Sequence, residues 1–341
     1  MKIAIINDTH FGARNDHQLF LDHFLTFFED VFFPYIEKNN IRTVFHLGDL
    51  MDRRKFVNFN TLYNVRRRFF DRMKDLADMH MIVGNHDTYY KNTNEVNSAK
   101  ELFQEYDNFY LYETAQDITL DNTKFCMVPW ICEDNKEEVL SHINNSNANI
   151  LCGHLELNGY EVARGIRHIG GMDDNVFKKF ELVLSGHFHN KSTGNNVYYL
   201  GTQYQITFSD EGDIKGFHVF DTETMELEFV ENKERMFYNI STAEKFSDYS
   251  FLKDKYVKLI VNKYSDRAEV DSMIYAIELV NPYDLTVIED MSIDCSDEDG
   301  LDLSKDTITI INEEIDLLEL DIDKGNLKKI SNEIYLEALN Q

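Results

Sequence analysis

The stretch Met81-Ile82-Val83-Gly84-Asn85-His86-Asp87 places a short apolar run directly before an amide, an imidazole and a carboxylate side chain. An apolar run rich in β-favouring residues predicts a buried strand, so the polar residues lie where that strand ends. The glycine at the junction suits a tight turn or a close approach of the backbone to a substrate. The stretch therefore predicts a functional loop at the end of a strand.

Four other segments of the chain repeat this arrangement. The apolar runs are Ile3–Ile6, Val44–Leu47, Ile150–Cys152 and Leu182–Ser185. The polar clusters that follow them are Asp8-Thr9-His10, Gly48-Asp49-Leu50-Met51-Asp52, Gly153-His154 and Gly186-His187-Phe188-His189. Ligands collect at the carboxyl ends of strands in open α/β sheets, where residues far apart in the sequence converge. The spacing therefore predicts one site built from all five clusters.

The residue types in these clusters suit two divalent cations. Carboxylate, imidazole and amide oxygen favour manganese, iron or zinc, and the clusters contain no cysteine for a thiolate zinc site. A central carboxylate can bridge two ions about 3.5–4 Å apart, and Asp49 is the natural bridge. A single Gly-His pair is more often a structural feature than a metal site. Five clusters in this order, each behind a strand, predict a two-metal hydrolase.

With these motifs the chain resembles the calcineurin-like metallophosphoesterases. The motifs D-x-H, GD-xx-D, GNHD, GH and GH-x-H span nearly the first two-thirds of the sequence. Segments after the last motif are similar to those of SbcD-type DNA repair nucleases, which work with an SMC-like ABC ATPase. These segments are Tyr199–Gln203, Phe208–Glu211 and Lys215–Phe217. The length and the acidic tail most resemble the small subunits of T-even-type phage recombination endonucleases.

The resemblance implies an α/β (α+β) fold of four layers, with two packed mixed β-sheets flanked by helices, a small βαβ cap domain and C-terminal helices. It implies a metallophosphoesterase nuclease domain at 1–235, a DNA-capping βαβ domain at 236–290, an acidic linker at 291–307 and a helical segment for ATPase docking at 308–341. The strand–helix–strand pattern over Tyr256–Glu289 agrees with such a cap domain. Near the N-terminus, Asp16 is expected to cap a Phe-rich helix that reaches toward Tyr35.

The resemblance also implies a role for each residue of the site. One metal would be held by Asp8, His10, Asp49 and His189, and the other by Asp49, Asn85, His154 and His187. The metals are expected to be Mn²⁺, with Mg²⁺ as the alternative.

His86 would be the general acid beside the scissile phosphate, a role that suits imidazole, and Asp87 would orient it. Many relatives carry a second histidine where this chain has Asp52. This departure leaves His86 as the main candidate for the general acid and makes Asp52 a supporting carboxylate.

The charge of the chain is distributed unevenly. A net charge of −27 should repel DNA, because DNA binding depends on cations that neutralise phosphates. However, the segment from Arg53 to Lys74 carries eight basic residues against Asp71 alone, and it begins directly after Asp52. A solvated helix face is the simpler interpretation for most of this segment. The candidates for phosphate contact are Arg53, Arg54 and Lys55.

The C-terminal part has the opposite character. From Glu289 to Asp323 the chain has fourteen acidic residues against Lys305 alone, which predicts a solvating linker or a surface for a basic partner. Apolar residues at helical spacing occur in and after it: Ile315, Leu318, Leu327, Ile330, Ile334, Leu336 and Leu339. Helices without a core of their own need a partner, and the resemblance implies the coiled-coil base of the ATPase. A homodimer is also expected.

Composition sets the remaining limits. The four cysteines form no CxxC pair, which favours a reducing compartment. No signal peptide and no run of about 18 apolar residues occurs, so we expect no membrane contact and a cytoplasmic protein, in the host cytoplasm if a phage encodes it.

Taken with the resemblance, these features predict a metal-dependent DNA exonuclease and single-strand endonuclease of double-strand-break repair and recombination. A general phosphoesterase acting on phosphoproteins or small phosphodiesters is one alternative, since the five clusters alone do not distinguish it. A non-catalytic scaffold is the other, although the intact ligand set argues against it.

Overall fold

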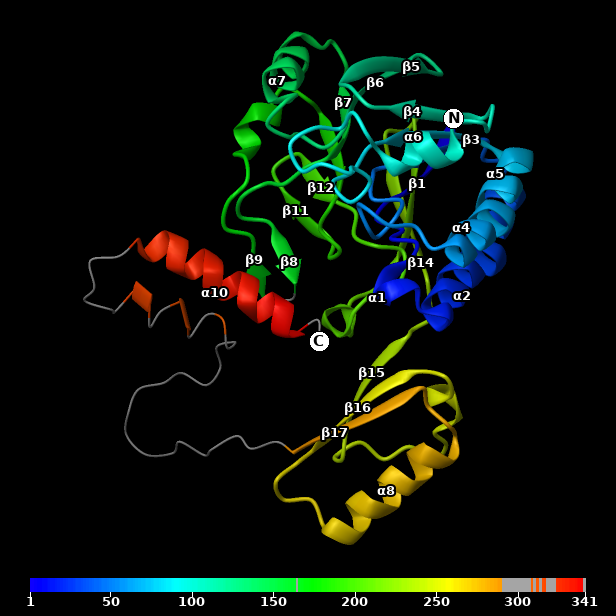
Figure 1. Ribbon diagram of the computed structural model, residues 1–341, viewed down its shortest axis with the longest axis vertical. Helices are drawn as coiled ribbons and strands as arrows, with labels where there is room; N and C mark the ends of the chain where they lie inside the picture. Colours follow the sequence, from blue (N-terminus) through cyan, green and yellow to red (C-terminus); the bar gives the residue numbers. More distant parts are fainter. Residues whose placement is uncertain (164, 290–307, 309–310, 313–314, 317–322, 340–341) are drawn as a thin grey trace. The chain divides into compact units, whose positions relative to one another are not determined.

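The chain forms two compact units, shown in Figure 1 as a computed structural model. The first unit comprises Met1–Tyr204 and Asp213–Glu234, and the second comprises Gln205–Gly212 and Arg235–Gln341. The structure describes residues 1–163, 165–289, 308, 311–312, 315–316 and 323–339. The acidic linker expected at 291–307 lies outside these residues.

A six-stranded mixed sheet forms one half of the first unit. Its strand order is β14-β13-β1-β2-β3-β4. The strands are β1 (Lys2–Ile6), β2 (Thr43–His46), β3 (Asp78–Ile82), β4 (Phe109–Tyr112), β13 (Gly216–Asp221) and β14 (Leu227–Glu231). Strands β1 to β4 run parallel, whereas β13 is antiparallel to both of its neighbours. The carboxyl ends of β1, β2 and β3 therefore lie at the same edge.

A second six-stranded sheet has the order β11-β12-β10-β7-β6-β5. Its strands are β5 (Gln116–Leu120), β6 (Thr123–Val128), β7 (Ile150–His154), β10 (Leu182–Gly186), β11 (Ser192–Gly194) and β12 (Val197–Tyr199). The four central strands are parallel, and the two edge strands are antiparallel to them. Strands β7 and β10 are neighbours, so their carboxyl ends also share one edge.

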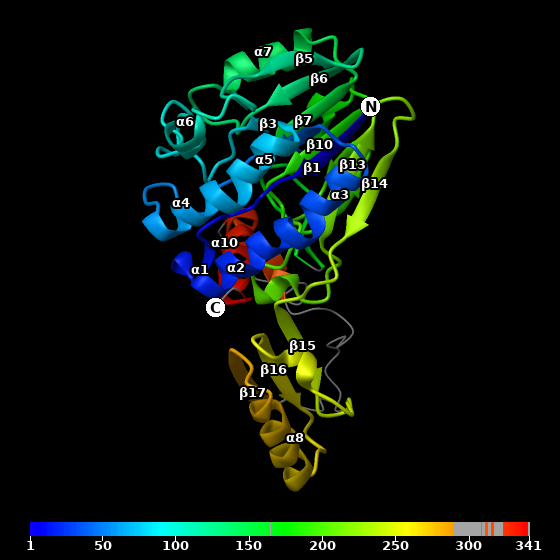
Figure 2. The same cartoon turned by 90° about the vertical axis from the view of Figure 1, so that its right-hand side faces the viewer.

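The two sheets pack face to face around a shared core. Ile3, Ile5 and Phe45 of the first sheet belong to one buried cluster with Ile150 and Leu184 of the second. Helix α7 (Lys136–Asn145) covers the outer face of the second sheet through Val139 and Ile143. Helices α2 (Gln18–Phe27), α3 (Phe33–Lys38), α4 (Phe59–Val65) and α5 (Asp71–Leu76) lie along the first sheet (Figures 1 and 2). The predicted pair of mixed sheets flanked by helices is confirmed.

The other elements of this unit are short. Single π-helical turns at Phe28–Phe32 and Arg66–Phe70 join α2 to α3 and α4 to α5. The remaining elements are α1 (Ala13–Asp16), α6 (Ser98–Phe103), the hairpin of β8 (Glu161–Ala163) and β9 (Ile166–Arg167), and a 3-10 turn at Asp174–Phe177.

The Phe-rich helical segment ends at Lys38, near the predicted Tyr35, but its predicted cap is wrong. The N-cap residue of α2 is His17, which makes no side-chain capping bond. Asp16 instead pairs with Arg53 and accepts a hydrogen bond from the Thr61 hydroxyl. The Asp16 carboxylate therefore contacts residues that are distant in sequence and does not cap the helix.

The second unit contains a three-stranded parallel sheet, β15 (Phe237–Ser241), β16 (Tyr256–Val261) and β17 (Asp284–Glu289), in that order. Helix α8 (Arg267–Leu279) connects β16 to β17, and Asp266 caps it by accepting from the backbone of Ala268 and Glu269. The predicted strand–helix–strand pattern is therefore present, with β15 as an additional strand. The unit also has 3-10 turns at Phe208–Asp210 and Ser250–Leu252, and helix α10 at Lys324–Leu339.

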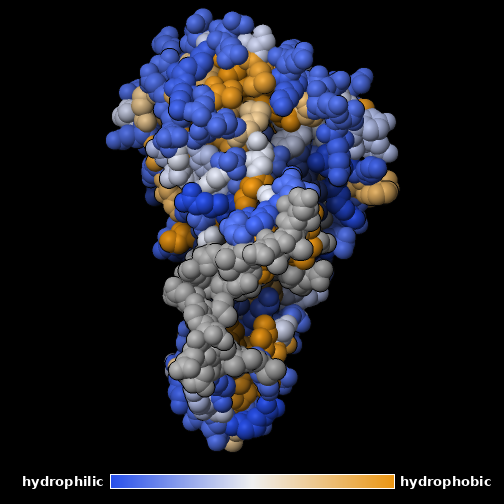
Figure 3. Space-filling view, turned by 90° about the vertical axis from the view of Figure 1, so that its left-hand side faces the viewer, coloured by the Kyte–Doolittle hydropathy of each residue, from blue (hydrophilic) through white to orange (hydrophobic). Residues whose placement is uncertain are grey.

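The surface is mainly hydrophilic on the face drawn in Figure 3, as the charge of the chain requires, with hydrophobic groups in smaller areas. No helix in the described part of the chain is long and apolar enough to span a membrane.

Candidate metal centre

All seven predicted metal ligands lie at or just beyond the carboxyl ends of five strands. Asp8 and His10 follow β1, Asp49 follows β2, and Asn85 follows β3. His154 is the last residue of β7, and His187 and His189 follow β10. The first three strands belong to one sheet and the last two to the other, so the site lies where the two sheets meet. The structure brings the seven side chains together in two adjoining groups.

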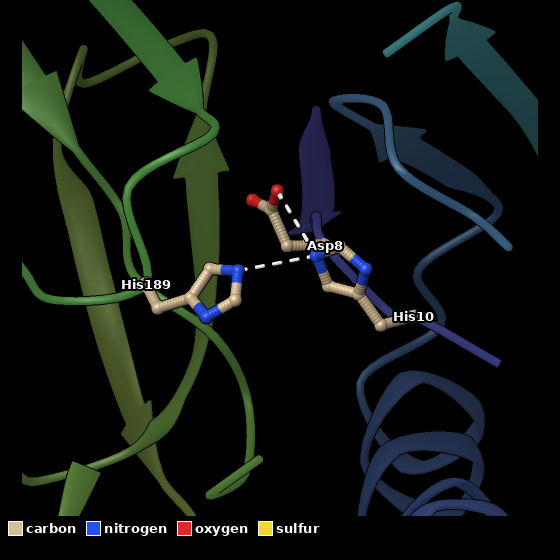
Figure 4. A group of neighbouring side chains, drawn as sticks. All are labelled: Asp8, His10 and His189. Atoms are coloured by element: carbon tan, nitrogen blue, oxygen red, sulfur yellow. Dashed lines mark hydrogen bonds and ion pairs between the residues drawn. The ribbon is translucent and has the colours of Figure 1, made fainter. Parts of the chain in front are cut away.

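The first group contains Asp8, His10 and His189 (Figure 4). The Nε2 atoms of His10 and His189 lie 3.1 Å apart, and His10 Nε2 lies 3.9 Å from Asp8 Oδ1. Each residue offers one ligand atom, and all these atoms lie within 4.8 Å of one another. This arrangement can hold one cation.

The second group contains Asp49, His154 and His187. Asn85 joins it, because its Oδ1 atom lies 2.9 Å from His154 Nε2 and 3.0 Å from His187 Nδ1. Asp49 Oδ2 lies 3.4 Å from His154 Nε2 in this group and 3.8 Å from His10 Nε2 in the first. The Asp49 carboxylate is thus shared by the two groups.

The backbone at the site is held in an unusual conformation. Asp8, His10, Asp49 and His187 all have positive φ, with values of 49°, 42°, 57° and 88°. Few non-glycine residues adopt this left-handed region, and such strain collects at functional sites. Gly84 allows the loops to approach closely, because a Cβ atom there would lie 2.2 Å from Asp49 Oδ1. Glycine is therefore needed before Asn85, and the group that approaches its backbone is the Asp49 loop.

Asp87 is fully buried, and its carboxylate holds the loop that carries Asp49. This residue was expected to orient His86. Its carboxylate accepts the backbone N–H groups of Asp49, Leu50 and Gly84 at 2.8–2.9 Å, and that of Met51 at 3.3 Å. These bonds fix the turn that carries Asp49. The predicted orientation of His86 by Asp87 is replaced by this backbone clamp.

His86 is held by the Asp52 backbone instead. Its Nδ1 atom donates to the Asp52 carbonyl oxygen at 2.5 Å, which leaves Nε2 as the free ring nitrogen. The half-buried His86 ring lies 4.9 Å from the His10 ring, centroid to centroid. The Asp52 carboxylate is 3.4 Å from His10 Nδ1, so it supports the far side of that imidazole. His10, Asp52 and His86 also form a third group of ligand-type atoms.

The electrostatics of the site favour positive charge. Burial lowers the pKa of both His10 and His154, but neighbouring carboxylates outweigh it and raise each pKa to about 9. Burial likewise works against ionisation of Asp49, yet His154, His86 and His10 hold its pKa well below its usual value. Protons on His10 and His154 would balance part of the buried negative charge, whereas burial and the charge of His154 lower the pKa of His187. Cations would replace those protons on binding.

Two buried residues that the sequence analysis did not select support the ligands. Asn7 Nδ2 donates to Asp8 Oδ2 at 2.6 Å and to the Gly201 carbonyl at 2.9 Å. The Thr9 hydroxyl donates to the Leu50 carbonyl and lies 3.1 Å from His46 Nε2. Asn7 and Thr9 could have been selected from the sequence, because they lie inside or directly beside the Asp8-Thr9-His10 cluster.

A scan against family models matches residues 1–191 to the calcineurin-like phosphoesterases. The chain belongs to this family. It is 30% identical to "Exonuclease subunit 1" of Enterobacteria phage T4, over 99% of both chains. It is 33% identical to a subunit of the nuclease SbcCD from Staphylococcus epidermidis, over 27% of this chain and 26% of the relative. The protein of the same name from Staphylococcus saprophyticus is 24% identical over 43% of this chain and 46% of the relative.

As a calcineurin-like phosphoesterase, the protein is a metal-dependent hydrolase, which confirms the predicted enzyme class. The residues present fit divalent cations of borderline hardness, since carboxylate, imidazole and amide ligands converge in a buried site. The raised pKa of His10 and His154 gives the same indication, because it reports an excess of negative charge.

The predicted phosphate-contact residues lie beside this phosphoesterase site, and each has a partner. Arg53 pairs with Asp16, Arg54 donates to the Thr88 hydroxyl at 2.9 Å, and the Lys55 ammonium lies 5.4 Å from the centre of the Tyr89 ring. Burial lowers the pKa of Arg54, while Asp49 and Asp87 raise it. Further along, Arg66 pairs with Glu105, and Arg68 with Asp22 and Glu29. Much of the basic segment is therefore neutralised within the chain.

Proposed function

We propose that the protein is a DNA nuclease, with exonuclease and single-strand endonuclease activity, and the nuclease component of a complex with an SMC-like ATPase that acts in double-strand-break repair and recombination. The observation that carries this proposal is the similarity to the phage exonuclease subunit, which extends over 99% of both chains. A phosphoesterase domain match alone would not favour DNA over other phosphate esters.

Two divalent cations, Mn²⁺ in the first instance and Mg²⁺ as the alternative, are bound by the two side-chain groups. Asp8, His10, Asp49 and His189 hold one, and Asp49, Asn85, His154 and His187 hold the other. The position of Asp49 Oδ2, 3.4 Å from His154 Nε2 and 3.8 Å from His10 Nε2, supports the shared ligand. When bound, such a pair supplies Lewis acidity and a nucleophile at neutral pH.

The residues of the chain supply the proton and the positioning. His86 Nε2 protonates the departing sugar oxygen, since Nδ1 is occupied by the Asp52 carbonyl. The Asp52 carboxylate and Asp87 hold His10 and the Asp49 turn in place. Arg54 is better placed than Arg53 to contact a phosphate, because Arg53 is paired with the Asp16 carboxylate, whereas Arg54 donates to the Thr88 hydroxyl. Arg53 and Lys55 contribute charge at the rim.

The domain roles follow from the same similarity. Residues 1–235 form the nuclease domain, 236–290 the DNA-capping domain and 308–341 the segment that docks on the ATPase. Ile330 and Ile334 are 43% and 61% exposed on α10, which supports docking through this helix. A homodimer is supported by Phe56, Phe59 and Tyr63, which are 71%, 87% and 57% exposed at and near α4.

The test is an assay of the purified chain with Mn²⁺ on single-stranded DNA, double-stranded DNA, a phosphopeptide and a small phosphodiester, with and without the ATPase. We expect DNA cleavage that is lost in Asp49→Asn. Cleavage of the phosphopeptide or the small phosphodiester, with DNA left intact, would identify a general phosphoesterase. Metal binding without turnover of any substrate would identify a scaffold.

A further inference from the structure

Trp130 lies beside two histidines of the metal centre and has no role in the mechanism above. It follows β6, whose neighbour β7 ends at His154, so the indole lies at the same sheet edge as the metal ligands. Trp130 is the only tryptophan of the chain. It is neither core nor fully exposed: its side chain is half-buried.

The backbone of Trp130 is fixed on both sides. Its N–H donates to the Val83 carbonyl at 2.8 Å, directly before Gly84 and Asn85. Its carbonyl accepts from the side chains of Asn94 and Asn135, each at 2.9 Å. The backbone that carries the indole is therefore fixed before any substrate arrives, which reduces the ordering cost of a contact.

The ring packs against two imidazoles of the second ligand group. Its centroid lies 5.2 Å from that of His187, at an interplanar angle of 44°, and 6.0 Å from that of His154, at 72°. His86, His187 and His189 are also half-buried, so these ligand-type side chains are partly accessible, and the Trp130 ring lies against one of them, His187. A phosphodiester at the metals would therefore bring its nucleoside close to the indole.

We propose that the Trp130 indole stacks on the base of the nucleotide next to the phosphodiester that is cleaved. This inference rests on the proposed nuclease function and deepens it. Stacking requires an unpaired base, so the favoured substrate is a single strand or a frayed end. Every base has a π-face, so the contact favours nucleotides over other phosphodiesters without selecting a sequence. Trp130 is in this account a specificity-determining residue.

The experiment compares Trp130→Leu with the unaltered protein, both loaded with Mn²⁺, on a thymidine oligomer and on an abasic oligomer of the same length. A stacked base contributes about a 5- to 150-fold advantage in kcat/KM. We expect the unaltered protein to show this preference and Trp130→Leu to lose it while binding the same amount of metal. Tyr198→Leu, which removes a partly exposed aromatic of β12, is the matched control and should keep the preference.

Fluorescence gives a second readout, because all indole emission comes from Trp130. In a His86→Ser background, which slows cleavage, the thymidine oligomer should change the emission and the abasic oligomer should not. An equal loss of activity by Trp130→Leu on both oligomers, or a fall in its metal content, would show that the indole only supports the histidines and would overturn the inference. DNA left uncleaved by the unaltered protein, with another phosphodiester cleaved, would overturn the proposed function instead.

Discussion

The backbone N–H of Asp49 donates to the buried Asp87 carboxylate at 2.9 Å, so the residue shared by both ligand groups is positioned by a residue 38 places later in the sequence. The same carboxylate holds the N–H groups of Leu50 and Gly84. The motif that contains Asp49 and the motif that contains Asp87 are thereby joined by hydrogen bonds from backbone N–H groups to a carboxylate. These bonds fix the backbone of the Asp49 turn without a contribution from any cation.

Replacement of Asp87 by asparagine tests this clamp. The amide offers only one acceptor oxygen and directs two donors at backbone N–H groups that are themselves donors. We expect a loss of about 1–3 kcal/mol in the free energy of unfolding and metal binding weaker by about 10- to 100-fold. Thermal unfolding and calorimetric metal titration measure the two effects. Asp107→Asn, at an exposed position, is the control, and equal metal affinity in both variants would contradict the clamp.

Asp49→Asn tests the shared ligand. An amide oxygen carries no charge and cannot balance two cations, so we expect most metal binding and all nuclease activity to be lost. The protein should stay folded, because the Asp49 side chain accepts the His86 N–H at 2.7 Å and an amide oxygen can do the same. Metal analysis, circular dichroism and a nuclease assay provide the measurements. Two metals still tightly bound in the variant would overturn the site model.

His86→Ser separates the general acid from the metal ligands. The variant should keep both cations and its DNA affinity but turn over about 10²- to 10⁴-fold more slowly, the usual loss for a general acid. The structure makes this a sharp test, since His86 also belongs to a group of ligand-type atoms with His10 and Asp52. If only one metal per chain remained, His86 would have to be assigned as a ligand.

Much of the fold and of the site could be predicted because both depend on local patterns. Buried strands leave apolar runs, and the residues after them were identifiable as Asp8, Asp49 and His187. Their left-handed backbone was not predictable, since it depends on loops from both sheets meeting. The cap at Asp16 failed for the same reason: its actual partners, Arg53 and Thr61, come from a distant segment.

The basic segment shows the same limit. Eight positive residues among twenty-two suggested a solvated helix face, with phosphate-contact candidates at its start. In the structure Arg66 pairs with Glu105, and Arg68 pairs with Asp22 and Glu29. The number of basic residues in a segment therefore does not give the number that remain without an acidic partner after folding. Trp130 was missed for a related reason, because a lone tryptophan after a strand gives no motif until the strands are placed side by side.

A buried histidine away from the metals gives a pH prediction. His80 accepts from the Tyr112 hydroxyl at 2.5 Å as a neutral ring, and burial lowers its pKa to about 4. The unfolded chain takes up this proton near pH 6.5, whereas the folded chain does so only near pH 4. Stability should therefore fall as the pH drops from 6.5 to 4, by up to about 3 kcal/mol from this residue. Below pH 4 the contribution should level off.

The measurement is urea unfolding at several pH values with a chelator present, for the unaltered chain and for His80→Gln. Glutamine can accept from Tyr112 but does not titrate, so the variant should show a shallower loss of stability between pH 6.5 and 4. Other buried histidines, such as His218, should contribute the same slope in both proteins and cancel in the difference. Identical pH profiles would show that His80 is not buried as a neutral ring.

Removal of the tail tests the docking proposal. A chain that ends near Asp290 retains every proposed ligand, since all lie at or before His189, so it should keep weak Mn²⁺-dependent nuclease activity. It lacks α10 with the exposed Ile330 and Ile334, and should therefore fail to bind the ATPase and lose any stimulation by ATP. Its affinity for DNA should rise slightly, because the acidic stretch up to Asp323 is removed. The matched variant is Ile330→Asp in the full chain, because it keeps the acidic stretch and alters only the apolar face.

The measurement is gel filtration with the ATPase. If the shortened chain co-eluted with the ATPase at the affinity of the intact chain, the docking surface would lie elsewhere. The βαβ unit would then be the next region to test.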